Sequence, residues 1–216
     1  DIVGFTTLSE QMEAEDLSNF LNFYLTNMCD IALKYGGTID KFIGDSLMIF
    51  FGDPDTKGAR EDAISCCQMA MEMLTFLESN QQHFQEMYNF PEKLEVRVGI
   101  HNGLCNVGNF GSAQRLDYTA IGRAVNVAAR LEQAAPKNSI LVSSAVRNLI
   151  KNKFETSSPI EVKAKGIDKP IASYVLTRQD TLNVKVIKEL DGLKLEYDPN
   201  KIDKKKLLQI IGELEN

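Results

Sequence analysis

Apolar residues recur every three or four positions along two long stretches of the chain, which is the spacing of amphipathic helices. The first stretch has its apolar positions at Leu17, Phe20, Leu21, Tyr24, Leu25, Met28, Ile31, Ala32 and Tyr35. Gly36-Gly37 comes next, and glycine commonly follows the last turn of a helix. The second stretch has the same period at Ala59, Ala63, Cys66, Cys67, Ala70, Leu74 and Leu77. We therefore expect two long helices that each bury one face.

Short apolar runs indicate strands before, between and after these helices. "TIDKFI" (38–43) and "SLMIFF" (46–51) flank Gly44-Asp45 and predict a hairpin, while "DIVGF" at the start and the stretch beginning "LEVRVGI" (94–100) predict two more strands. The order is strand, helix, strand, strand, helix, strand. This is the split βαβ pattern of ferredoxin-like folds, which carry helices on one face of an antiparallel sheet. We expect an α+β fold, an α/β sandwich with a palm-like βαββαβ core.

Additional strands and helices follow this core without a linker. We expect a strand or turn at "RLDYTAIG", a helix at "GRAVNVAARLEQAA", a strand at "SILVS", a short helix near "SSAVRNLI" and two strands at "PIEVKAKG" and "PIASYVLT". The last residues change character: they suggest a small hairpin around Asp191-Gly192 and a charged amphipathic helix with Ile202, Leu207, Leu208, Ile210, Ile211 and Leu214. We assign residues 1–178 to one domain and 179–216 to a C-terminal extension with a regulatory or packing role.

Composition narrows the class of protein and the kind of metal site. With 44% hydrophobic and 25% charged residues, the chain is typical of a globular protein. Its net charge of −6 argues against nucleic acid as a partner, because duplex binding depends on a basic face. No apolar run has the length of a membrane span and no signal segment opens the chain, so we expect a soluble, cytoplasmic domain.

The cysteines and histidines give little support to a thiolate or imidazole metal site. Four cysteines occur without a CxxC spacing, and only two histidines are present. We expect the cysteines to be buried free thiols. Any metal would then be held by oxygen atoms.

Gly44-Asp45 places a carboxylate between two strands. Asn-Gly or Asp-Gly is the order that suits the favoured hairpin turns, so the reversed order suggests a carboxylate aimed from a rigid tip. In a ferredoxin-like sheet, Asp1 at the end of the first strand would lie beside this tip. The following residues, including Phe5 and Thr6, would present free backbone N–H groups to phosphate oxygens. Two carboxylates beside such a turn suit a pair of magnesium ions, although either aspartate alone could be an ordinary strand-end or turn residue.

A second polar pair lies in the segment "VNVAAR". Asn126 and Arg130 are four residues apart, so both lie on one face of the expected helix, within an otherwise apolar segment. Arg130 could stabilise charge on a reacting phosphoryl group and Asn126 could hold a sugar oxygen. The alternative is an exposed polar stripe in which Arg130 pairs with an acid such as Glu132.

Four separated motifs resemble those of class III nucleotidyl cyclases, the family that makes cyclic AMP or cyclic GMP. "DIVGFT", "DKFIGDSLMIFFG", "VRVGIHNG" and "DYTAIGRAVNVAARLE" occur in the order and at the spacings of that family, over residues 1 to about 178. Several chemically meaningful motifs agree, which makes the resemblance far more specific than a single glycine pattern.

The resemblance implies a role for each matching residue. Asp1 and Asp45 are expected to bind two Mg²⁺ or Mn²⁺ ions per active site, with the Ile2 carbonyl as a further ligand. Lys41 and Thr119 match the base-selecting positions, and Asn126 and Arg130 match the pair that orients the ribose and stabilises the transition state. Arg115 and Lys165 are similar to basic residues that hold the triphosphate, with Lys163 competing for the second position. Family sites are shared between two chains, so a homodimer with two equivalent sites is implied.

Hydrogen bonding at the base-selecting pair favours ATP. The Lys41 ammonium can only donate, which suits adenine N1 and opposes the N1–H of guanine. Thr119 can accept from the adenine amine; its hydroxyl could also donate, so discrimination should depend more on Lys41. Many family members have Asp at this position, and Thr resembles the subclass that often responds to bicarbonate or carbon dioxide.

The expected reaction converts ATP to 3′,5′-cyclic AMP and pyrophosphate by two-metal-ion catalysis. One metal ion would activate the ribose 3′-hydroxyl, the other would hold the triphosphate with the loop around Phe5 and Thr6, and Arg130 would stabilise the charge on the α-phosphoryl oxygens. No protein nucleophile is needed, and we expect His101 to be structural.

Two other functions compete with this one. A catalytically silent nucleotide-binding or partner-binding module would usually lack one of the aspartates, Asn126 or Arg130, and none is missing. A diguanylate cyclase would have a GGDEF-type hairpin, whereas this chain has "FIGDSL" and the "VNVAAR" helix.

The chain begins at Asp1 itself, so we expect that most of the first strand either lies in an upstream segment or is impaired. A sensor, membrane or regulatory segment could lie upstream.

Overall fold

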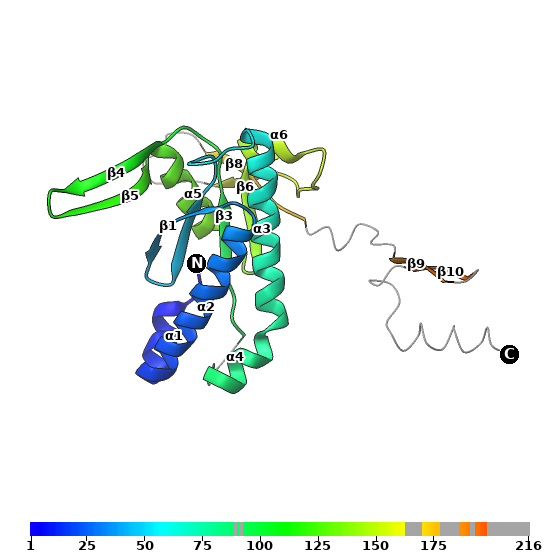
Figure 1. Cartoon of the computed structure of the whole chain (residues 1–216), viewed down its shortest axis with the longest axis horizontal. Coiled ribbons are helices and arrows are strands. Elements are labelled where there is room, and N and C mark those ends of the chain that lie inside the picture. The colour runs from blue at the N-terminus through cyan, green and yellow to red at the C-terminus, as the bar shows by residue number, and fades with distance from the viewer. Residues whose placement is uncertain (89, 91–92, 163–169, 178–185, 191–192, 198–216) are drawn as a thin grey trace. The chain divides into compact units, whose positions relative to one another are not determined.

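The computed structural model describes residues 1–88, 90, 93–162, 170–177, 186–190 and 193–197. The chain divides into two compact units, Asp1–Leu176 and Thr177–Asn216. In the first unit, pairs of helices are followed by strands along the chain, α5 packs against β3 and β5, and β1 contacts β5 (Figure 1).

Both long helices predicted from the apolar spacing are confirmed. They are α2 (Ala14–Lys34) and α3 (Ala59–Ser79), each of 21 residues. Gly36 follows α2 with a φ of 82°, a conformation that glycine adopts without steric cost. The shorter helices are α1 (Phe5–Gln11), α4 (Gln81–Tyr88), α5 (Arg123–Ala134) and α6 (Ser144–Ile150). The sequence patterns predicted α5 and α6 but not α4.

The strands of the first unit form two hairpins and one larger sheet. The predicted hairpin is present as β1 (Thr38–Ile43) and β2 (Ser46–Phe50). A second hairpin joins β4 (Asn106–Ser112), which was not predicted, to β5 (Arg115–Ile121), which settles the strand-or-turn choice for "RLDYTAIG". The larger sheet has the order β3-β6-β8-β7, from β3 (Arg97–Ile100), β6 (Ser139–Ser143), β8 (Ile171–Val175) and β7 (Ile160–Val162). Its β3–β6 pair is parallel and the other two pairs are antiparallel.

The start of the chain pairs with the segment that leads into β3. Ile2 and Val96 form an isolated antiparallel bridge, flanked by hydrogen bonds from Val3 N to Glu95 O (2.8 Å) and from Arg97 N to Asp1 O (2.9 Å). The predicted first strand is therefore reduced to this bridge. The bridge pairs the chain start with the segment that leads into β3, and β3 is the fourth strand of the expected βαββαβ core.

The main core lies between the long helices and the sheet. Its fully buried members include Phe20 of α2, Cys67 of α3, Phe84 of α4 and Val142 of β6. A smaller apolar cluster holds α5 in place through Val127, Leu131, Ala135, Leu141 and Val162. Site residues on α5 thus project from a helix whose other face is anchored.

The second unit contains one antiparallel hairpin among the described residues. Strands β9 (Val186–Leu190) and β10 (Leu193–Tyr197) pair with Leu190 opposite Leu193. The amphipathic helix that we predicted after them lies outside the described residues. Within the described part of the chain, no helix combines the length and apolar character needed to cross a bilayer.

Candidate active site

Gly44 and Asp45 form the two-residue loop of the β1–β2 hairpin, since Ile43 pairs with Ser46. Gly44 has a φ of 65°, and Asp45 is not among the described residues with positive φ. Glycine with positive φ at the first loop position is the pattern of a type II′ turn. Our view that Gly-Asp reverses a preferred order was therefore wrong, because Gly-first is the order that this other favoured hairpin turn requires.

The structure brings Asp45 to the start of the chain. The Ile2 N–H donates a hydrogen bond of 2.9 Å to Asp45 Oδ2. In the antiparallel bridge to Val96, Asp1 O and Val3 N make the hydrogen bonds to the segment 95–97. The N–H and C=O of Ile2 therefore both point away from that segment, toward the side where Asp45 lies. The Ile2 carbonyl and the Asp45 carboxylate therefore lie on the same side of the chain start, and Asp1 is the neighbouring residue.

This donor set fits a hard divalent cation. Two carboxylates and one backbone carbonyl are oxygen ligands, and Mg²⁺ is commonly held by one or two carboxylates, with substrate phosphates and water completing its coordination. No group of three or more His, Cys, Asp or Glu side chains suited to a metal occurs among the described residues. Two carboxylates and one carbonyl leave coordination positions that substrate phosphates and water can fill.

Glu132 of α5 is a third acid near this position that sequence reasoning did not assign to the site. Burial raises the pKa of its carboxyl group, and the negative charge of Asp45 raises it further, whereas Arg97 lowers it. Its Oε1 and the Nε of Arg97 are buried without a hydrogen-bond partner among the described residues. The only indication in the sequence that Glu132 lies near the site was its position two residues after Arg130.

Phe5 and Thr6 are the first two residues of α1, so the helix begins directly after Gly4. Gly4 has a φ of 72° and contributes no side-chain cap. The N–H groups of the first helical turn have no partner within a helix. The predicted phosphate-binding N–H groups thus belong to a helix start that follows the Asp1–Ile2 segment immediately.

Lys41 and Thr119 come from different hairpins and meet around Asp40, a residue that the sequence analysis missed. Thr119 Oγ1 lies 2.8 and 2.9 Å from the two carboxylate oxygens of Asp40. The Ala120 N–H donates to Asp40 Oδ2 at 2.7 Å, and Lys41 Nζ lies 3.2 Å from Asp40 Oδ1. The two predicted base-selecting residues therefore share one carboxylate partner.

Asn126 and Arg130 lie on α5, which is held against β3 at Gly99. A Cβ at Gly99 would lie 2.2 Å from Glu132 N and 2.4 Å from Ala128 O, so only glycine permits this approach of helix and strand. Asn126 is exposed, and the Arg130 guanidinium donates to Gln133 Oε1 at 2.8 Å. The alternative in which Arg130 pairs with Glu132 is therefore wrong, because Gln133 on the same helix takes that place.

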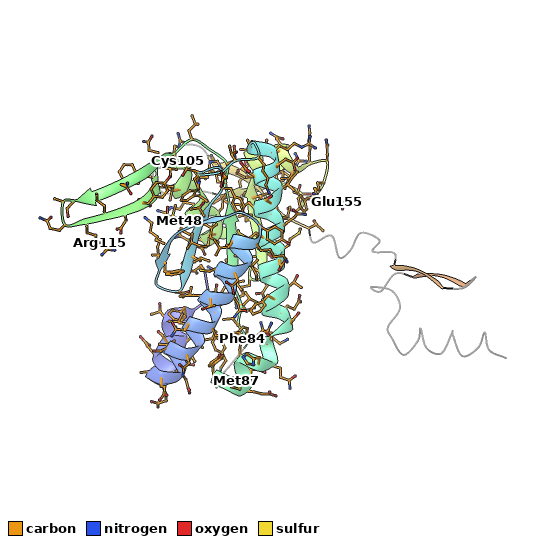
Figure 2. The ribbon with its side chains drawn as sticks, viewed as in Figure 1. Met48, Phe84, Met87, Cys105, Arg115 and Glu155 are labelled. Atoms are coloured by element: carbon orange, nitrogen blue, oxygen red, sulfur yellow. The ribbon has the colours of Figure 1, made fainter. Side chains whose placement is uncertain are left out.

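Arg115 lies apart from the other predicted residues of its own chain. It stands at the end of the β4–β5 hairpin, which extends away from the rest of the first unit (Figure 2). Its side chain is 82% exposed, and its Nε lies 3.4 Å from a carboxylate oxygen of Asp117. Lys165 and its competitor Lys163 fall outside the described residues.

His101 has a structural environment, in keeping with the prediction. Its Nδ1 lies 2.9 Å from the hydroxyl of Ser143, which also caps α6. Burial lowers the pKa of His101, and the positive charge of Arg123 lowers it further. Neutral imidazole is therefore favoured at this position.

The four cysteines are free, as predicted, but they are not all buried. Cys67 is fully buried in the core, and burial raises the pKa of its thiol. Cys105 is exposed just before β4, so the expectation of burial was wrong there. That expectation assumed a core position, whereas the loop after β3 runs along the surface.

Comparison with known proteins identifies the family to which this geometry belongs. The family model for the adenylate and guanylate cyclase catalytic domain matches residues 1–178. The chain belongs to this family. The match covers all of the predicted site residues and sets aside the diguanylate cyclase alternative.

Solved structures of cyclase domains confirm the α+β, palm-like fold. The crystal structure of the adenylyl cyclase CyaB from P. aeruginosa is 46% identical, with a TM-score of 0.79, and the match covers 82% of this chain and 90% of that one. The guanylyl cyclase Cya2 is 30% identical, with a TM-score of 0.76, and the match covers 82% of this chain and 87% of that one. Both adenylyl and guanylyl cyclases are thus similar to this cyclase domain.

Curated relatives include an adenylate cyclase of Anabaena cylindrica, 36% identical over 81% of this chain. Adenylate cyclase 1 of Rhizobium meliloti is also 36% identical, over 77% of this chain. The matched region makes up 35% of the Anabaena protein and 25% of the Rhizobium protein. The cyclase domain thus corresponds to about a third or less of these longer proteins.

Proposed function

We propose that this chain is the catalytic part of an adenylate cyclase, which converts ATP to 3′,5′-cyclic AMP and pyrophosphate at sites formed between two copies of the chain. The observation that carries the choice of ATP is the placement of Lys41 and Thr119 on one carboxylate. This pair presents a donor and an acceptor, which match N1 and the exocyclic amine of adenine. The similarity to adenylate cyclases of two bacteria and to CyaB supports the same choice.

Asp1, the Ile2 carbonyl and Asp45 would hold two Mg²⁺ or Mn²⁺ ions, which supply positive charge that acidifies the ribose 3′-hydroxyl and holds the triphosphate. The hydrogen bond from Ile2 N–H to Asp45 Oδ2 supports this role, because it fixes one ligand against the segment that carries the other two. The N–H groups at Phe5 and Thr6, immediately after this segment, would bind phosphate oxygens.

Asn126 and Arg130 would act on the ribose and the reacting phosphate. The 3′-oxygen bonds to the α-phosphorus, the bond to pyrophosphate breaks, and the 3′-hydroxyl proton is released. Asn126 would hold a ribose oxygen in line for this attack. Arg130, whose Gln133 partner is a neutral amide, keeps its charge available for the α-phosphoryl oxygens.

The positions of the proposed site residues support a dimer. Asp45 and Lys41 are on one hairpin, but we propose that they serve two different sites, as in the family pattern. Large apolar side chains are exposed along the β4–β5 hairpin and the tip of β1, and they support a partner surface there: Phe42, Ile43, Phe110, Leu116, Tyr118 and Ile121. Arg115, together with Lys165, would hold the triphosphate bound by the partner chain.

The direct test is an assay of the purified chain with manganese and either ATP or GTP. We expect cyclic AMP and pyrophosphate from ATP, and much less cyclic GMP from GTP. Asp45→Ala should lower product formation at least about a hundredfold, because it removes a metal ligand, whereas Asp55→Ala, an exposed aspartate in the following loop, is the matched control. Wild-type product no higher than that of Asp45→Ala would refute the catalytic proposal, and equal efficiency with GTP would refute the role of Lys41.

We also propose that bicarbonate or carbon dioxide regulates this activity, since Thr119 matches the subclass in which this response is common. Activity measured at fixed pH should then rise when bicarbonate replaces chloride. Identical rates in the two salts would refute this regulation and leave the catalytic proposal unaffected.

A further inference from the structure

Asp40 is a buried charged residue in the β1 strand to which neither the family motifs nor the proposed reaction assigns a role. Its side chain is fully buried, with 0% exposure, whereas the adjacent Lys41 side chain is 43% exposed. The pairing of β1 with β2 shifts register between Ile39 and Lys41, so Asp40 is the extra residue of a β-bulge. A bulge leaves its residue outside the ladder and can redirect its side chain. Here the redirected side chain reaches β5.

Each oxygen of the Asp40 carboxylate faces a group that can only donate a hydrogen bond. The Ala120 N–H donates to Oδ2 at 2.7 Å, and the Lys41 ammonium lies 3.2 Å from Oδ1. Asp40 is therefore held as an acceptor at both oxygens. Thr119 Oγ1, at 2.8 and 2.9 Å from these same oxygens, must donate its proton to Asp40.

This hydrogen bond removes the ambiguity of the threonine hydroxyl. A free hydroxyl can donate or accept, but one whose proton is already donated offers only lone pairs to a ligand. Thr119 is 4% exposed, so its side chain is held in place by its surroundings. Its oxygen can then accept from the exocyclic amine of adenine, and it opposes O6 of guanine, which is also an acceptor.

We propose that Asp40 is a positioning residue for base selection, which makes Thr119 an acceptor and holds the Lys41 ammonium beside it. The inference rests on the proposed adenylate cyclase function and deepens it. It also changes an expectation from the sequence: discrimination depends on Thr119 as well as on Lys41. A purely structural role, in which Asp40 only ties β1 to β5, is the alternative that the experiment must separate.

The test is the Asp40→Asn variant of the full 216-residue chain, assayed with ATP and with GTP in the presence of Mn²⁺. If the amide oxygen takes the Oδ2 position and accepts from Ala120 N–H, the amide NH₂ takes the Oδ1 position, where it faces both Thr119 and the Lys41 ammonium. The NH₂ donates to Thr119, so the threonine proton becomes free to point toward a base, and the Lys41 ammonium loses its acceptor. We expect the ratio of kcat/KM for ATP to that for GTP to fall by about tenfold. Asp55→Asn is the matched control and should keep the wild-type ratio.

A double variant shows whether Asp40 acts through the Thr119 hydroxyl. Thr119→Val removes the hydroxyl at nearly constant shape, so adding Asp40→Asn to the Thr119→Val variant should change the ratio far less than adding it to the wild type. An unchanged ratio in Asp40→Asn would overturn the proposal. The same change in both backgrounds would overturn the action of Asp40 on the Thr119 hydroxyl, which is the part of the proposal that makes Thr119 an acceptor. A wild-type chain that makes no cyclic nucleotide would instead refute the proposed function, so the two failures are distinct.

An observation on the wild-type chain keeps the test valid if Asp40→Asn does not fold. A hydroxyl proton donated to a buried carboxylate exchanges slowly with water and is visible by proton NMR. We expect such a proton on Thr119, assigned by selective threonine labelling and by its loss in Thr119→Val. A Thr119 hydroxyl in fast exchange with solvent would contradict the proposal.

Discussion

Single side chains of the site are already fixed by hydrogen bonds within one chain. Asp45 accepts from the Ile2 N–H, and Thr119 donates to Asp40. Each bond joins residues far apart in the sequence. Folding itself therefore brings Asp45, the proposed metal ligand, to the chain start, and it brings Thr119, the proposed base-selecting residue, to Asp40. The site is therefore largely preorganised, which lowers the cost of ordering it when nucleotide binds.

His101 gives a pH-dependent prediction at the residue scale. Burial and Arg123 lower its pKa below the ordinary value of 6.5, so the unfolded chain binds the proton more readily than the folded one. The stability that neutral His101 provides is present above that pH and is lost as the pH falls through 6.5 toward the folded-state value. Wild type should therefore lose more free energy of unfolding than His101→Gln between about pH 7.5 and pH 5.5.

Urea denaturation at the two pH values measures this difference. A His83→Gln variant is the matched control for replacing a histidine. Equal losses in wild type and His101→Gln would show that the imidazole does not titrate in this way.

Among the elements, the contact of α5 with β3 positions Asn126 and Arg130, and it depends on Gly99. Gly99→Ala would place a methyl group 2.2 Å from the Glu132 backbone nitrogen, so the helix must shift. We expect a loss of about 2–3 kcal/mol in the free energy of unfolding, together with a large loss of cyclase activity.

Gly108→Ala is the matched control, because the atom nearest to its added Cβ would be a Phe110 ring carbon at 3.9 Å. Thermal unfolding should leave this control close to wild type; it is a control for stability alone, because Gly108 pairs with Thr119 across the hairpin. A Gly99→Ala protein with wild-type stability would contradict the close packing of α5 on β3.

Some helices and strands could be predicted from the sequence, and others could not. The periodic spacing from Leu17 to Tyr35 predicted α2, and the apolar runs around Gly44-Asp45 predicted the β1–β2 hairpin, because core burial imposes those patterns. Strand β4 was missed because "NVGNFGS" has neither alternation nor strand propensity, and it is a strand only through pairing with β5. Asp40 was missed for a similar reason: one inserted bulge residue redirects a side chain, and the sequence does not show where a bulge falls.

For the molecule as a whole, the exposed apolar surface of the β4–β5 hairpin predicts self-association. Leu116 is 62% exposed there, and Leu33 on α2 is equally exposed at 61%. Leu116→Glu should weaken a dimer by about tenfold or more, because it places a charge in an apolar interface, whereas Leu33→Glu should leave dimerisation unchanged. Sedimentation velocity over a range of concentrations measures both. Equal dimer affinity in the two variants would place the interface elsewhere.

We propose that each active site combines the metal ligands of one chain with the base-selecting and transition-state residues of its partner. Mixing two inactive variants, Asp45→Ala and Arg130→Ala, tests it most directly. In a mixed dimer, one site receives its metal ligands from the Arg130→Ala chain and its arginine from the Asp45→Ala chain, so that site is intact. After exchange at equal concentrations, we predict cyclic AMP formation at about a quarter of the wild-type rate, since half of the dimers are mixed and each has one working site. A mixture as inactive as its two components, beside an active wild type, would contradict the shared site.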